Sequence, residues 1–75
     1  MQTIDYIWLS AAQSLATDLA KLITLFEKED NHMAKDMVNK YNADMNLLFR
    51  EVHELFGDTG YRIVVDTYMR ARKGE

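Results

Sequence analysis

The sequence predicts an all-α fold: an antiparallel hairpin of two long helices, with a shorter third helix packed across them. Three observations indicate this fold. The 75-residue chain has no proline and only three glycines, at positions 57, 60 and 74, so neither of the strongest helix breakers occurs before residue 57. Residues that favour helices, such as Ala, Leu, Met, Lys and Glu, are frequent. The apolar residues also recur every three or four positions, as on a buried helix face.

The first predicted helix covers about residues 3–28. Its apolar residues occupy an arc of about 220° in helical projection, which is wider than one neighbouring helix can cover. We therefore expect this helix to be covered from more than one direction. One seam of this arc consists of Trp8, Ala12, Leu15, Leu19, Leu22 and Phe26, with Leu9, Ala16 and Ile23 beside it and Ile4, Ala11 and Leu25 on the other shoulder.

The second predicted helix covers about residues 31–56. Ten of its apolar residues fall within an arc of about 120° that contains no polar residue: Ala34, Met37, Val38, Tyr41, Met45, Leu48, Phe49, Val52, Leu55 and Phe56. Met33 and Leu47 project outside this arc. Asp30 or Asn31 can cap its first turn, and Gly57 stands where a left-handed residue commonly ends a helix. The short connection predicts an antiparallel hairpin, although it lacks Gly and Pro, which leaves one bent continuous helix as an alternative.

The third segment, about residues 60–72, fits two kinds of secondary structure. Tyr61, Val64 and Tyr68 have helical spacing, whereas Tyr61, Ile63 and Val65 alternate as in a strand. A single strand in a helical chain would leave its backbone groups without partners, so we expect a helix. The whole chain then forms one small helical domain, residues 1–75.

The size of the chain predicts a homodimer. A domain of this length buries only about 60% of the surface of its unfolded chain. Because the sequence contains no cysteine, neither disulfides nor a cysteine-based zinc site can add stability. The third helix is also too short to cover the rest of the first. We expect the apolar face of the first helix to pair with a second copy in a helical bundle.

Composition restricts the kinds of partner and the compartment. Nine Lys and Arg against twelve Asp and Glu give a net charge of −3, which disfavours general binding to nucleic acid or anionic lipid. The N-terminal residues do not have the pattern of a secretory signal, and the sequence lacks an apolar run long enough to span a membrane. The absence of cysteine is compatible with a reducing compartment, so we expect a cytoplasmic protein without membrane contact.

Neither a catalytic site nor a cofactor or metal site is expected. Glu29 and His32 match the Glu-x-x-His spacing of di-metal bundles, but the second such motif is missing and the inward faces of both long helices are apolar. His53 lies at the edge of an apolar stripe, and its spacing from other residues assigns no Ser-His-Asp arrangement. We therefore expect a protein that is not an enzyme.

The function predicted from the sequence is that of a helical interaction module, acting as an adaptor, inhibitor or regulator. It would bind itself and an unidentified protein by burying leftover apolar surface, while charged residues set specificity. The residues predicted for the dimer or partner interface are Ile7, Trp8, Leu9, Asp18, Leu25, Met33 and Leu47.

The alternative is a nucleic-acid-binding regulator with a helix-turn-helix-like segment at residues 48–73. Its predicted contacts would be Arg62, Arg70, Arg72 and Lys73. The net charge of residues 53–73 is only +1, however, because three acidic residues accompany these four bases. Asp58 and Asp66 would also occupy positions that are usually apolar in this motif.

Overall fold

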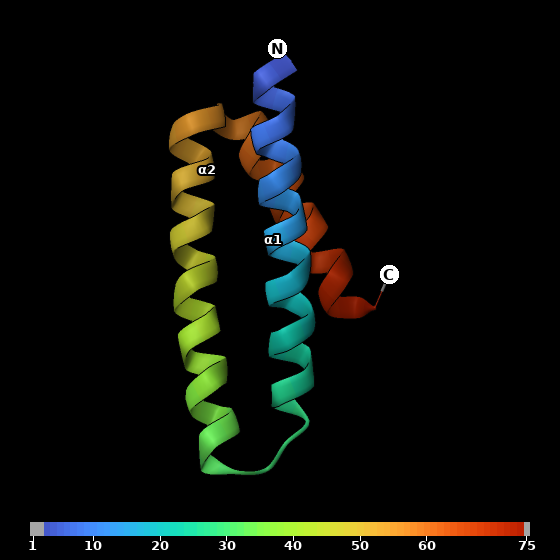
Figure 1. Ribbon diagram of the computed structural model, residues 1–75, viewed down its shortest axis with the longest axis vertical. Coiled ribbons are helices and arrows are strands. Elements are labelled where there is room, and N and C mark those ends of the chain that lie inside the picture. Colours follow the sequence, from blue (N-terminus) through green and yellow to red (C-terminus); the bar gives the residue numbers. More distant parts are fainter. Residues whose placement is uncertain (1–2, 75) are drawn as a thin grey trace.

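The computed structural model describes residues 3–74, which form two helices, α1 (Thr3–Glu27) and α2 (His32–Lys73), without a strand in that range. This confirms the predicted all-helical class, and it decides between helix and strand for residues 61–69. Figure 1 shows α1 and the first half of α2 side by side and running in opposite directions. Neither helix contains, within the described residues, an apolar stretch that would cross a bilayer.

The helix ends follow ordinary capping rules. Asn31 is the N-cap of α2, with extended backbone angles (φ −145°, ψ 161°), and its side-chain oxygen accepts a hydrogen bond of 2.8 Å from the backbone N–H of Ala34. At the other end, Gly74 adopts the left-handed conformation (φ 85°, ψ 18°), and its N–H bonds to the carbonyl of Ala71. The basic residues in the last turn suit the negative end of the helix dipole.

The prediction of a separate third helix is wrong. Residues 60–72 belong to α2, which runs to Lys73 through a kink at Gly57 (φ 71°, ψ −164°). These angles are not those of a left-handed helix cap, and only glycine adopts them readily. Figure 1 shows that the chain turns back on itself at this kink. We call residues 32–56 the N-terminal arm of α2 and residues 58–73 its C-terminal arm.

The core draws on both helices and both arms of α2. Ile23 in α1, Met45 in the N-terminal arm and Val64 in the C-terminal arm are the largest fully buried side chains. The main cluster consists of Leu9, Ala16, Leu19, Met45, Val52 and Val64.

The buried face of α1 differs from the predicted seam. Leu9, Ala16 and Ile23, at seven-residue intervals, form its buried line, whereas Trp8 and Leu15 are 61% and 48% exposed. The reason is the position of the C-terminal arm. It packs on α1 beyond this line, and so moves the covered arc away from Trp8 and Leu15.

Polar and aromatic contacts hold the C-terminal arm in place. Gln13 Nε2 of α1 donates a hydrogen bond of 2.9 Å to Thr67 Oγ1. Phe49 packs edge-on against Tyr68, with 5.5 Å between the ring centroids. Phe49 makes a similar contact with Tyr61 at 6.0 Å. The arm is therefore tied to α1 and to the N-terminal arm.

An ion pair anchors the end of the C-terminal arm to the end of α1. Arg72 donates two hydrogen bonds, of 2.6 and 3.1 Å, to the two carboxylate oxygens of Glu27, and a third of 3.0 Å to Thr24 Oγ1. The hydrogen bonds from Arg72 lower the pKa of the Glu27 carboxyl below its ordinary value of 4.5, although partial burial opposes the shift. The same bonds raise the pKa of the Arg72 guanidinium.

Candidate interaction surface

Six of the seven residues predicted for an interface are exposed. These are Ile7, Trp8, Asp18, Leu25, Met33 and Leu47. Leu9 is different, because it is only 4% exposed and belongs to the core. The structure therefore removes Leu9 from the predicted interface. The homodimer, and a partner for the other six residues, stay predictions.

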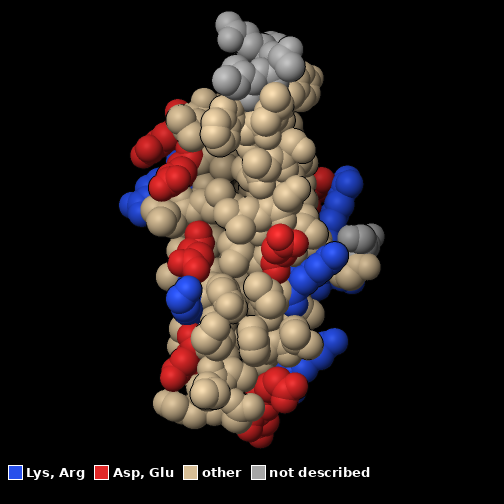
Figure 2. Space-filling model, in the orientation of Figure 1, with Lys and Arg blue, Asp and Glu red and all other residues tan. Residues whose placement is uncertain are grey.

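An apolar groove lies between α1 and the N-terminal arm of α2, on the face turned away from the C-terminal arm. It consists of two adjoining hollows of 230 and 280 Å³. Figure 2 shows this face, where surface without charged residues runs along the two helices and most charged groups lie at the sides. The groove is lined by Trp8, Ala11, Ala12, Leu15 and Leu19 of α1 and by Asp44, Leu47, Leu48, Glu51, Val52, Leu55 and Phe56 of α2.

The groove has the repeat of a helix on both walls. Trp8 and Leu15 on one wall, and Leu48 and Leu55 on the other, are each seven residues apart, which is about 10 Å along a helix axis. Leu55 is the most open of its apolar residues, with 75% of the side chain exposed. Covering apolar groups that are this exposed with a partner stabilises the complex, because it removes apolar surface from water.

The charges that line the groove are all acidic. They are Asp44 and Glu51, and both lie on the wall formed by α2. The Nζ of Lys40 is 3.6 Å from the Asp44 carboxylate, in an exposed pair one turn apart. Glu51 has no ion-pair partner among the described residues.

A second line of exposed residues follows the outer shoulder of α1. Ile7, Asp18 and Leu25 lie at intervals of eleven and seven residues, which is close to three turns and two turns of one helix face. Asp18 forms no ion pair with any residue in the described range. This shoulder is continuous with the groove through Ala11 on α1, but it has no second wall.

The predicted nucleic-acid contacts are partly engaged within the protein. Arg72 is bound to Glu27, as described above, and Arg70 Nε lies 3.1 Å from the carboxylate of Asp66. Two of the four bases are thus neutralised by carboxylates, while Arg62 and Lys73 lie exposed on the same arm. The positive charge that this arm can offer to a phosphate backbone is accordingly small.

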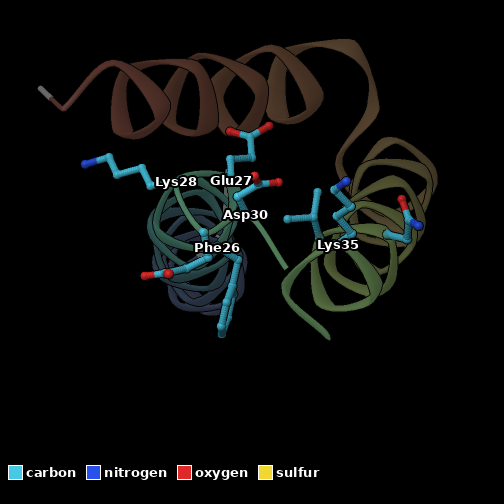
Figure 3. A pocket seen from close by; sticks show the side chains of 8 residues that line it. Phe26, Glu27, Lys28, Asp30 and Lys35 are labelled. Atoms are coloured by element: carbon cyan, nitrogen blue, oxygen red, sulfur yellow. The ribbon is translucent and has the colours of Figure 1, made fainter. Parts of the chain in front are cut away.

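Two other clusters of polar side chains lie outside the groove, one at the Gly57 kink and one near the connection between the helices. His53 Nε2 lies 2.7 Å from Asp58 across the Gly57 kink, but no hydroxyl group in the described residues bonds to this pair. A hollow near the connection between the helices holds charges of both signs. Figure 3 shows Glu27 in that hollow pointing toward the C-terminal arm, while Phe26 points the other way. Residues 3–74 contain no group of three or more His, Cys, Asp or Glu that could hold a metal ion.

Of the twelve residues that line the groove, the sequence analysis predicted only Trp8 and Leu47 for an interface. The most informative of the ten others are Leu15, Leu48 and Leu55. They were expected in the buried seams of the two long helices. An acidic residue four positions earlier does not mark them, because Leu9 and Ala34 have the same spacing from an acidic residue and are each only 4% exposed.

Comparison of the chain with protein-family models, curated proteins and solved structures gives no match. The surface must therefore be interpreted from its own geometry.

Proposed function

We propose that the protein is a non-enzymatic helical interaction module that binds a helix of another protein in the groove between α1 and α2. The observation that supports this proposal is the set of exposed apolar residues that meet there from two helices. Trp8 and Leu15 supply one wall, and Leu47 and Leu55 belong to the other. Large aromatic and aliphatic side chains of this kind are the usual anchors of protein interfaces.

A helix is the shape of partner that suits this groove. Two parallel walls with a seven-residue repeat match the spacing of apolar side chains at positions i, i+3 or i+4, and i+7 of an amphipathic helix. Such a helix would lie along the hairpin as a further member of the bundle. The groove has few polar groups to orient a small molecule, because its lining is apolar apart from two carboxylates.

The homodimer predicted from the sequence would place a second copy on the same face, which makes a second copy the competing occupant of the groove. The nucleic-acid alternative is less well supported, because Arg70 and Arg72 are paired with carboxylates. We also propose that the module acts in the cytoplasm, given a sequence without cysteine.

The proposal can be tested with a designed probe, a 14-residue amphipathic peptide with leucine on one face and alanine and glutamine on the other. Trp8 is the only tryptophan of the chain and lies in the groove, so its fluorescence reports occupancy. We expect saturable binding with a blue shift of the Trp8 emission.

A groove variant and a matched control make the test specific. Replacing Leu15 and Leu55 with serine should abolish binding, whereas replacing Met33, which is 77% exposed and outside the groove, should not. Circular dichroism of each variant checks that the fold is retained. Equal binding by the groove variant and the control would refute the proposed site.

A further inference from the structure

We infer that the partner of the groove is an amphipathic helix that carries lysine or arginine beside its apolar stripe. This inference rests on the proposed function, and it adds the charge of the partner. It is based on the arrangement of charged groups around the groove, which is independent of the apolar lining.

The two acidic residues of the groove, Asp44 and Glu51, lie along one wall, and we call this pair the acidic rail. Asp44 and Glu51 are seven residues apart on α2, so their side chains lie on the same side of the helix about 10 Å from each other. No basic residue lines either hollow. Lys40 lies 3.6 Å from Asp44 at the edge, so Glu51 is the one of these two carboxylates without an ion-pair partner among the described residues. A bound helix would therefore meet negative charge along one edge and apolar side chains in the middle.

A basic helix matches this rail in spacing as well as in sign. Lysine or arginine residues seven apart on the partner would come beside Asp44 and Glu51 together, while leucines between them entered the hollows. The long aliphatic stems of these bases would also cover Leu47 and Leu55 at the rim. Acidic side chains on the partner would instead be repelled.

A second copy of the chain is a less suitable occupant of the groove. It would bring its own Asp44 and Glu51 to the same interface, so that four carboxylates would surround one apolar patch. Among the described residues of the N-terminal arm, Lys40 is the one Lys or Arg in an ion pair, and its partner is Asp44. Like charges close together at an interface oppose association.

The test compares three 14-residue peptides that share the same leucine positions and differ only in the residues beside them: lysine, glutamine or glutamate. Binding is followed by Trp8 fluorescence at several NaCl concentrations. We expect the lysine peptide to bind about 3- to 10-fold more tightly than the glutamine peptide, as expected for two exposed ion pairs, and the glutamate peptide to bind more weakly. The preference should shrink as salt rises.

Two double variants of equal net charge separate the rail from the overall charge of the protein. In D44N/E51Q, the preference for lysine should disappear while binding of the glutamine peptide is retained. In the control, E29Q/D30N, the same number of charges is removed at the connection between the helices, outside the groove. The control should keep the preference.

The possible results distinguish this inference from the proposed function. Equal affinity for all three peptides, with loss of binding in the Leu15 and Leu55 variant, would overturn the charge inference and leave the groove as a binding site. Lysine-peptide binding that survives in that variant would overturn both. If light scattering gives a dimer that the groove variant converts to a monomer, and no peptide binds, the occupant is a second copy and the inference is wrong.

Discussion

Replacing Gly57 with alanine should destabilise the protein, because the kink in α2 depends on a backbone conformation that other residues avoid. At φ 71° and ψ −164°, a non-glycine residue is strained by about 1–3 kcal/mol. A Cβ at this position would meet no atom within 4 Å, so no steric clash adds to the strain. The whole effect should come from the backbone.

The expected loss of unfolding free energy in Gly57→Ala is smaller than the backbone strain energy. Alanine also restricts the unfolded chain, which returns about 0.4–1 kcal/mol. Subtracting the second contribution from the first, the free energy of unfolding should fall by about 0–2.6 kcal/mol, with a central value of about 1.3 kcal/mol. For a domain of this size each 1 kcal/mol lowers the melting temperature by about 4–8 °C. Urea and thermal unfolding, followed by circular dichroism at 222 nm as a standard helix signal, measure both quantities.

The sign of the change makes this prediction decisive. If residue 57 were an ordinary residue within a continuous helix, the same substitution would stabilise the protein by about 1 kcal/mol, because alanine is the better helix former. Gly74→Ala provides a control, since Gly74 also has positive φ (85°) and open space around its Cβ position but lies at the end of α2. A Gly57→Ala protein at least as stable as the unmodified protein would refute the kink.

Two further experiments test how the C-terminal arm is packed. Gly60→Ala should cost more than Gly57→Ala in unfolding experiments, because a Cβ there would collide with the Cβ of Phe56, which cannot move as freely as a side-chain end. A double-mutant cycle of Glu27→Gln and Arg72→Gln should give a coupling of about 0.5–1 kcal/mol, since the pair is bidentate but partly exposed. This coupling should be present above about pH 4.5 and lost as the pH falls through the lowered pKa of Glu27, and a pH-independent coupling would contradict the ion pair.

The sequence predicted the local elements well because their causes are local. Apolar periodicity and helix propensity gave the helical class, and a polar residue before the apolar stripe gave the N-cap at Asn31. Gly57 was expected to end the second helix, and the structure has a kink within α2 there instead. Whether α2 stops there or continues to Lys73 depends on the backbone angles of Gly57, which the sequence does not specify.

The candidate site was predicted only in part, for a reason that Trp8 and Leu9 illustrate. Both are large, apolar and adjacent in sequence, and the wide apolar arc of α1 includes both. Leu9 is buried and Trp8 is exposed, because the C-terminal arm occupies the side of α1 on which Leu9 lies. Periodicity gives the width of an apolar face, but not which part of it a distant segment covers.

The sequence by itself determined that the chain is helical, where its two long helices begin, and that α1 has more apolar surface than one neighbour can bury. Only the tertiary structure decided how that surface is divided, with Ile23 and Leu9 inside and Trp8 and Leu15 on the wall of a groove. The physical reason is that helix formation depends on residues within a few positions of one another. Burial depends instead on where Thr67 and Arg72, some 50 residues away in sequence, meet α1.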